Sequence, residues 1–198
     1  RTSGSGDVYA IALGLVGWNS IDQGEGTSNI IAGAGGAAAG NLINRGQGFG
    51  SISATAGGVL AGNWVDSQAD GQINEVAIGA LVGVNVGKRT ASGDNVMVAY
   101  GTLVGWNTMV ISDDNPLVNR SSTLVAIGGG LATNIITARA ANNTVVDVAV
   151  GIGFGLNVAA LGNGNNTVVN VAGAYYGALN YAGVGDGDNT VVEVAAGT

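Results

Sequence analysis

The chain has 198 residues, and its 37 glycines and 10% charged residues set it apart from an average globular protein. It contains no His and no Cys, which excludes a disulfide, a thiolate or His-assisted nucleophile and a zinc site built from the usual ligands. The net charge of −7 argues against a nucleic-acid partner, and no apolar run reaches the ~18 residues that indicate a membrane-spanning helix.

One asparagine recurs along the chain at a nearly constant interval. Counted along the sequence, the first four intervals are each 22, and the next three are 27, 23 and 23. Residues 15–19 return unchanged as residues 103–107, displaced by four periods of 22. A period of about 20 to 50 residues is typical of solenoids, in which each unit buries its apolar face against its neighbours. The eight asparagines are Asn19, Asn41, Asn63, Asn85, Asn107, Asn134, Asn157 and Asn180.

The positions upstream of each asparagine differ in the residues that they accept. The position two before it is always Gly or Ala, and the position six before it is Gly in six of the eight coils, which indicates a bend. The position nine before it is always Ala or Val, whereas the position ten before it varies from Tyr9 to Glu75 and Asp147. A constrained column beside a variable one is the period-two signature of a half-buried strand. The sequence therefore predicts that the side chain nine before each asparagine points into the core and that the side chain ten before it points to solvent.

These patterns predict an all-β fold, a β-solenoid of about 8.5 coils with roughly 22 residues and two strands per coil. We expect residues 1–198 to form a single domain whose coils stack parallel and in register. Val-rich segments such as 144–148 and 167–171 also have high strand propensity. A disordered glycine-rich chain or an antiparallel sandwich would not preserve one residue at a spacing of 22.

Stacked asparagines can bond amide to amide along the solenoid, as in cross-β ladders. We therefore predict that the eight asparagines face inward as a ladder. The alternative is that each is a turn residue with a backbone bond of its own. Both interpretations are structural, so the sequence assigns no catalytic residue, no cofactor and no metal site.

The longest interval, between Asn107 and Asn134, contains Pro116, the only proline of the chain. Because proline cannot lie within a central ladder, we expect a surface excursion over about residues 111–121, either as a contact loop or as a neutral insertion. Glycosylation sequons occur at Asn119, Asn142 and Asn165, all near predicted turns.

The ends of the solenoid show no capping helix in the sequence, and residues 188–198 amount to half a coil. Uncapped, in-register ends favour head-to-tail growth. The residues expected at this subunit joint are Asp7, Val8, Tyr9 and Ala10 at one end and Thr190, Val191, Val192, Glu193 and Val194 at the other. A second expected surface is the small-residue column eight before each asparagine, which would suit lateral packing. Its members are Thr55, Ala77, Ala99, Ala126, Ala149 and Ala172.

In its tandem strand-turn-strand units with a period near 22, its amide ladder and its glycine bends, the chain resembles curlins, the secreted subunits of bacterial curli fibres. Curlin units have Ser, Gln, Gly, Asn and Gln at set positions, whereas these coils carry Gly or Ala at the second position before Asn and place Ala or Val where glutamines would stand. The resemblance implies assembly into a fibre by stacking. We expect a secreted, non-enzymatic subunit that polymerises head-to-tail with further copies of itself and serves a biofilm matrix, adhesion or a sheath.

Two other functions stay open at this stage. A polysaccharide-binding or polysaccharide-cleaving β-helix would use surface carboxylates, and Asp147 and Glu193 would lie in one outward column about 9.6 Å apart. An ice-binding solenoid would use a flat Thr face, and Thr144, Thr167 and Thr190 recur at a spacing of 23. Calcium binding has less support, because the Gly/Asp-rich segment 185–189 occurs only once.

Overall fold

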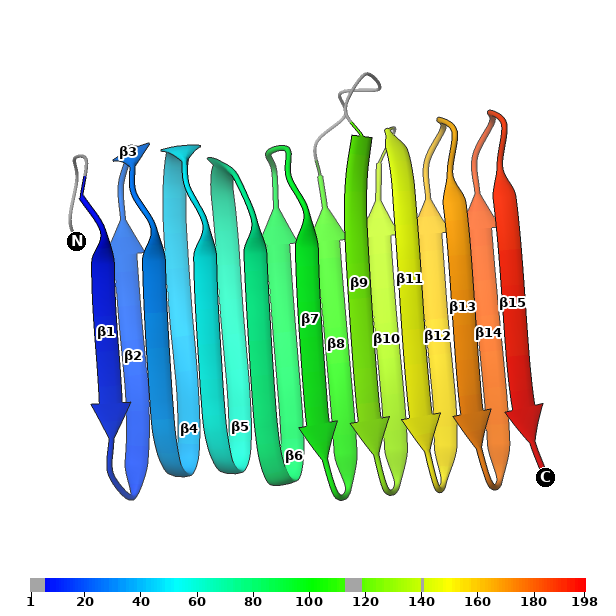
Figure 1. Ribbon diagram of the computed structural model, residues 1–198, viewed down its shortest axis with the longest axis horizontal. Coiled ribbons are helices and arrows are strands. Elements are labelled where there is room, and N and C mark those ends of the chain that lie inside the picture. The colour runs from blue at the N-terminus through cyan, green and yellow to red at the C-terminus, as the bar shows by residue number, and fades with distance from the viewer. Residues whose placement is uncertain (1–5, 113–118, 140) are drawn as a thin grey trace.

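The computed structural model describes residues 6–112, 119–139 and 141–198, and fifteen strands in these residues wind into a β-solenoid (Figure 1). Successive coils pair in parallel, as the asparagine period predicts. Most of the expected surface excursion falls on residues 113–118, outside the described residues. The strands are β1 (Val8–Leu13), β2 (Val16–Gln23), β3 (Gly26–Thr27), β4 (Ile30–Phe49), β5 (Ile52–Asp70), β6 (Ile73–Arg89), β7 (Asn95–Gly101), β8 (Val104–Ile111), β9 (Asn119–Gly128), β10 (Leu131–Ala138), β11 (Asn142–Gly151), β12 (Phe154–Leu161), β13 (Thr167–Ala174), β14 (Gly177–Val184) and β15 (Thr190–Gly197).

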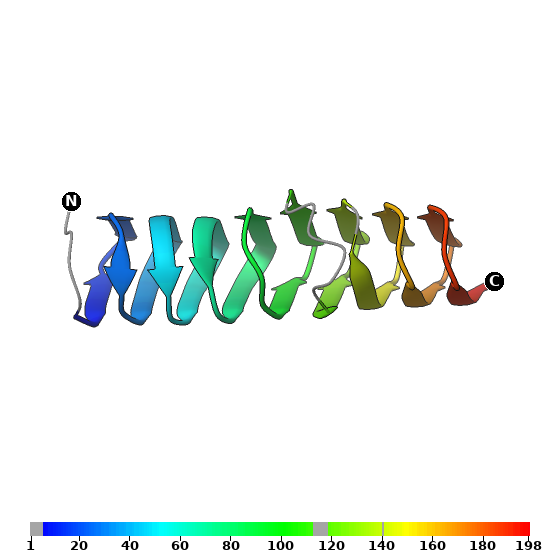
Figure 2. The same cartoon turned by 90° about the horizontal axis from the view of Figure 1, so that it is seen from above.

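The coils form two flat layers. The Val layer contains β1, β7, β9, β11, β13, β15 and the first halves of β4, β5 and β6. The Asn layer contains β2, β8, β10, β12, β14 and the second halves of the same three long strands. The body is elongated along the stacking direction, with the N- and C-terminal coils at opposite ends (Figure 2).

The core lies between the two layers and is filled by every second side chain of each strand, as the period of two in a strand requires. In the Val layer Ile30, Ile52 and Ile73 stack in one buried column. Nearer the bends the core narrows to alanines such as Ala56 and Ala77. Small side chains there let the two layers approach as the chain turns from one to the other.

The bends between the layers need glycine because the chain folds closely back on itself. A Cβ atom on Gly79 would lie 1.9 Å from the Val82 carbonyl oxygen, and one on Gly101 would lie 2.1 Å from the Val104 carbonyl oxygen. Real Cβ atoms do not approach backbone oxygens so closely. The glycine column six before each asparagine is therefore a bend from the fourth coil onward, as predicted.

A one-residue register shift separates the third coil from the fourth. Asn63 pairs with Asn85, a sequence separation of 22, but in the Val layer Ala54 pairs with Glu75, a separation of only 21. The difference is absorbed in the bend that follows Gly58. Successive side chains of a strand point to opposite faces. A position counted back from the asparagine therefore lies on one face before the shift and on the other face after it.

The inside and outside positions predicted from the asparagine count are consequently right for the first coils and wrong from the fourth. Ala32 and Ala54, nine before their asparagines, are buried as predicted. From Val76 onward the ninth position faces out and the tenth faces in, so Glu75 and Asp147 are buried in the core. The valines nine before each asparagine in these coils thus belong to an outer surface rather than to the core.

The predicted small-residue lateral face is wrong for the same reason. Its alanines line the core, and only Thr55, which precedes the shift, is exposed. At most 1% of the surface is accessible in Ala77, Ala99, Ala126, Ala149 and Ala172. From Ala77 onward this column cannot contact another molecule.

The register shift can be tested with two glycines that occupy the same position before an asparagine. A Cβ atom on Gly57 would meet nothing within 4 Å, whereas one on Gly79 would meet the Val82 carbonyl oxygen. We expect Gly79→Ala to lower the free energy of unfolding by about 2–4 kcal/mol and Gly57→Ala to change it by less than about 1 kcal/mol. Urea unfolding followed by circular dichroism compares them, and equal losses would contradict the shift.

Candidate functional site

The eight predicted asparagines form one continuous amide ladder. From Asn19 to Asn157, each Nδ2 donates to the Oδ1 of the asparagine in the next coil over distances of 2.8–3.0 Å, and Asn180 is the last acceptor. Each Nδ2 also donates to a backbone carbonyl of the next coil in the Val layer, as Asn107 does to Val125 at 2.8 Å. The predicted inward ladder is confirmed, and the alternative of isolated turn residues is wrong. The bond from Asn107 to Asn134 shows that the longest interval leaves the stack intact.

A second amide ladder, which was not predicted from the sequence, runs along the polar turns of the last coils. Asn143 Nδ2 donates to Asn166 Oδ1, and Asn166 Nδ2 donates to Asn189 Oδ1, both at 2.9 Å. Asn143 and Asn166 are buried. The signal was present in the sequence, because these three asparagines recur at a spacing of 23 like the threonines beside them.

The three sequon asparagines stack above one another at the outside of the same turns. Asn142 Nδ2 donates to Asn119 Oδ1 at 3.1 Å, and Asn142 Oδ1 accepts from the Asn165 backbone N–H at 3.0 Å. Asn165 Oδ1 in turn accepts from the Asp188 N–H at 3.0 Å. These side chains already have a structural role, and glycosylation at them stays a prediction.

Two carboxylates are buried without partners. Glu75 and Asp147 have no exposed surface, and among the described residues none of their carboxylate oxygens has a hydrogen-bond partner. Burial raises the pKa of Glu75 well above its ordinary value and that of Asp147 to about 8. The predicted surface pair of Asp147 and Glu193 is therefore wrong, because the column that they share faces the core. Glu193 is exposed because it lies in the last strand, β15.

Arginines close the core beside the polar turns. Arg89 is fully buried and donates to the backbone oxygens of Gly71 and Asp94. Burial lowers the pKa of Arg89 to about 10, and the negative charges of Asp70 and Asp94 partly offset that effect. Arg45 is buried in the same inward column two coils away. Both side chains hold turn backbone in place rather than facing a ligand.

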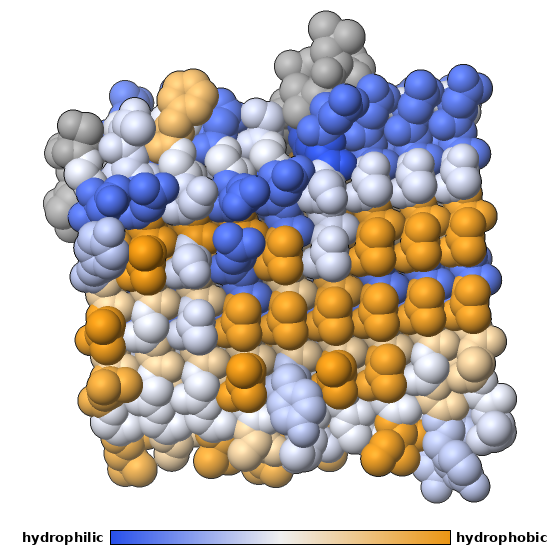
Figure 3. Space-filling model, in the orientation of Figure 1, coloured by the Kyte–Doolittle hydropathy of each residue, from blue (hydrophilic) through white to orange (hydrophobic). Residues whose placement is uncertain are grey.

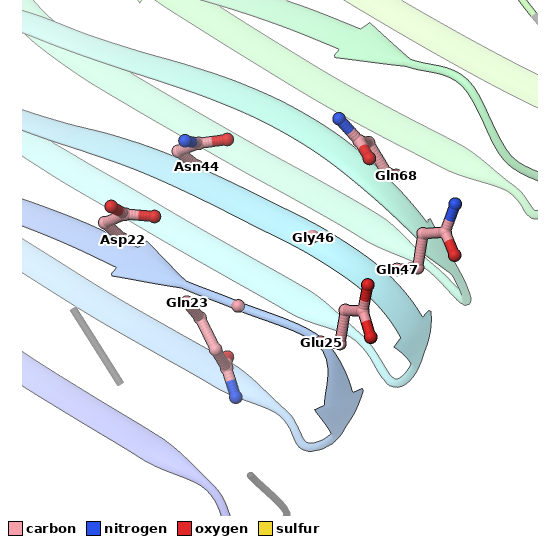
Figure 4. Close-up of a pocket in the computed structure, with 8 residues that line it drawn as sticks. Asp22, Gln23, Glu25, Asn44, Gly46, Gln47 and Gln68 are labelled. Atoms are coloured by element: carbon pink, nitrogen blue, oxygen red, sulfur yellow. The ribbon is translucent and has the colours of Figure 1, made fainter. Parts of the chain in front are cut away.

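A polar hollow of about 650 Å³ lies at the turn side of the first coils (Figure 4). Asp22 lines it from β2, Gln68 from β5, and Asn44 and Gln47 from β4, while Glu25 borders it from the segment between β2 and β3. Within the part of the chain that the structure describes, no three His, Cys, Asp or Glu residues are grouped to hold a metal ion. The hollow therefore has two carboxylates and several amides, and no ligand is assigned to it.

The threonine row is stacked as the sequence predicts. Thr144, Thr167 and Thr190 pair in register and are exposed, and Ser121 precedes them in the same row. The row is short and lies beside the polar turns. Ice binding stays a prediction for it.

The ends of the solenoid leave strand edges open. Among the described strands β1 and β2 pair only with β4, while β14 pairs only with β12 and β15 only with β13. Apolar side chains are correspondingly exposed: Ile11 is 79% exposed and Leu15 is 81% exposed, and every residue of β15 is exposed. The residues predicted at the subunit joint lie on or directly beside the open strands β1 and β15.

The comparisons with known proteins add no function to this geometry. No protein-family model matches the chain, and no curated protein and no solved structure matches it. In the described residues no helix is long and apolar enough to cross a membrane. The amide ladders, the open ends and the outer faces are therefore the features on which a function has to be argued.

Proposed function

We propose that the protein is a structural subunit that polymerises head-to-tail, with the open edge of β15 in one copy joined to the open edge of β1 in the next. The observation that carries this proposal is that both edges belong to the Val layer and continue its parallel register. An open strand edge is a template for another strand. A heterologous contact of this kind extends without closing, so the product is a fibre.

Continuing the register across the joint predicts which residues meet. Val191 would stack on Val8 of the next copy, and Glu193 would stack on Ala10. The Asn layer would be one strand short at this place, because β15 extends one strand beyond β14. The gap leaves no amide hydrogen of Asn180 unused, since its Nδ2 already donates to the Asn170 and Val194 carbonyl oxygens.

Charge substitutions at the joint test this arrangement. Ala10→Glu would place a second carboxylate against Glu193, so we expect polymerisation to be at least tenfold slower. Ala10→Lys would place an opposite charge there, so it should polymerise at least as well as the unchanged chain. The double variant Ala10→Glu/Glu193→Lys should recover growth. Light scattering and electron microscopy at low salt measure the extent and rate of assembly.

The double variant is the control for folding, because it contains the same glutamate as the blocked chain. Recovery by charge reversal shows that the two positions meet. If Ala10→Glu polymerises like the unchanged chain, or if Ala10→Glu/Glu193→Lys stays blocked while folded, the joint between β15 and β1 is wrong.

An extracellular fibre is the setting that we propose for this subunit, in line with its resemblance to curlins. A biofilm matrix, an adhesin or a sheath would use the same end-to-end growth. An antibody against the chain should then label material outside the source cells, and label confined to the cell interior would contradict the location.

A further inference from the structure

The outer surface of the Val layer carries three in-register rows of mostly apolar side chains over its last six strands, and the middle row is unbroken (Figure 3). The middle row is made only of valine. One flanking row contains Asn74 and Thr123 beside four valines, and the other contains Tyr100, Gly173 and Ala196 beside Ile and Val. The middle row is Val76, Val98, Val125, Val148, Val171 and Val194. We call these three rows from β6 to β15 the Val face.

The Val face is uncharged. The acidic residues of these strands, Glu75, Asp147 and Glu193, all belong to the inward column. The face is also accessible at its borders, where Ile78 is 52% exposed and Val150 is 48% exposed. Soluble monomers rarely expose a continuous apolar patch larger than a few hundred Å², which marks such a patch as an interaction surface.

The register shift between the third and fourth coils creates this face. Before the shift the middle row itself is interrupted by Gly33 and Thr55, whereas from Val76 onward it is unbroken valine. After it the valines point outward and the alanines beside them point inward. A chain without the shift would have buried Val148 and exposed Ala149.

We propose that the Val face is covered by the Val face of a second copy, in a two-fold symmetric pair. Six strands at ~4.8 Å spacing and about 20 Å of strand length give a footprint of about 600 Å² per copy, so a pair would bury about 1,200 Å². That area exceeds the roughly 1,000 Å² that a specific interface needs.

The pattern of the rows also favours a second copy as the occupant. Side chains that repeat at the strand spacing interdigitate along their whole length only with a surface of the same spacing, as in dry interfaces between paired sheets. The Val face is such a surface for itself, and with no charge on it two copies can approach without repulsion. This pairing is independent of the end-to-end joint, since it uses a face along the solenoid rather than an end.

A lysine in the middle of the face tests the pairing against a matched control on the opposite layer. Val148 and Val158 are half-buried valines of the same coil, one on the Val face and the other on the outside of the Asn layer. In the Ala10→Glu background, sedimentation should give twice the 19.3 kDa of one chain. Adding Val148→Lys should weaken this dimer at least tenfold, and adding Val158→Lys should leave it unchanged.

Circular dichroism establishes that each lysine variant is folded. Should Val148→Lys not fold, the nearly isosteric Val125→Thr/Val148→Thr replaces it and should also weaken the dimer at least tenfold. The pairing is overturned if the unsubstituted face gives only monomers at all concentrations, or if the two lysine variants behave alike. Monomers that bind phosphatidylcholine vesicles through Val148 would assign the face to a lipid surface and would also overturn the pairing.

The end joint and the pairing fail separately. If Ala10→Glu leaves end-to-end growth intact, the end joint is wrong, while the comparison of Val148→Lys with Val158→Lys still decides the pairing.

Discussion

Replacing Asn41 with alanine is expected to lower the free energy of unfolding by about 3 kcal/mol or more, because two neighbouring amides in the core lose their partner. Asn19 Nδ2 would lose the Asn41 Oδ1 acceptor, and Asn63 Oδ1 would lose its Asn41 Nδ2 donor, each from a bond of 2.8 Å. The Thr55 carbonyl would lose its amide donor as well. Each buried polar group left without a partner costs about 1–3 kcal/mol.

The matched control is Asn44→Ala on the same strand, since Asn44 is exposed further along β4. It should change the free energy of unfolding by less than about 0.5 kcal/mol. Urea unfolding followed by circular dichroism measures both variants. Similar small losses for Asn41→Ala and Asn44→Ala would show that the ladder does not stabilise the stack.

Replacing Asp147 with asparagine is expected to stabilise the protein at neutral pH. In the folded state burial raises the pKa of Asp147 from 3.8 to about 8. Between these two values the unfolded chain releases the proton while the folded chain keeps it. The contribution of Asp147 to stability is therefore greatest below about pH 4 and falls by about 1.4 kcal/mol for each pH unit up to about pH 8.

Asp147→Asn removes this pH dependence because an amide does not titrate. We expect the variant to gain up to about 4 kcal/mol over the unchanged chain at pH 7 and to gain little at pH 4. The inserted amide also lies beside Asn170, with which Asp147 pairs in the next coil. Urea midpoints at pH 4 and pH 7 give the comparison.

Glu193→Gln is the control for this effect, since Glu193 occupies the same column but is exposed in the last strand. It should shift the midpoints much less than Asp147→Asn does. If the stability that Asp147→Asn gains over the unchanged chain is no larger at pH 7 than at pH 4, the result would contradict a buried and unpartnered Asp147 carboxylate.

The asparagine period was sufficient to predict the coils, the two strands in each and the ladder. An amide that recurs at the length of one coil stacks on its own image, and in a dry core it has to bond there. The glycine bends followed from the same alignment. These features depend only on the number of residues per coil, which a sequence displays directly.

The orientation of the Val layer could not be obtained by counting from the asparagines, because from the fourth coil onward the bend before each asparagine is one residue longer. Ala54 lies nine residues before Asn63, whereas its partner Glu75 lies ten before Asn85. A different series contains the correct register: Ala34 pairs with Ala56 at an interval of 22, and Ala56 pairs with Ala77 at an interval of 21. Counting from the alanines would have placed Asp147 in the core and Val148 outside. The error of one residue moved the expected contact surface from the valines to the alanines.

The candidate functional surfaces were harder to predict than the core for a physical reason. The residue types in a core column are constrained by the neighbouring coils of the same chain, and the amides of a ladder form hydrogen bonds to one another. An open edge such as that of β15, or a face such as the one around Val148, would be completed only by a molecule that the sequence does not contain. Only the side chains that remain accessible after folding show where such a partner would bind.

Electron cryo-microscopy of the purified chain after assembly tests the central claim that coils continue in register from one copy to the next. We expect fibres whose strands lie across the axis with a rise of ~4.8 Å and whose subunits repeat about every 43 Å, the height of nine Val-layer strands. Particles that remain single 19.3 kDa chains at every concentration, or fibres with strands along the axis, would contradict it.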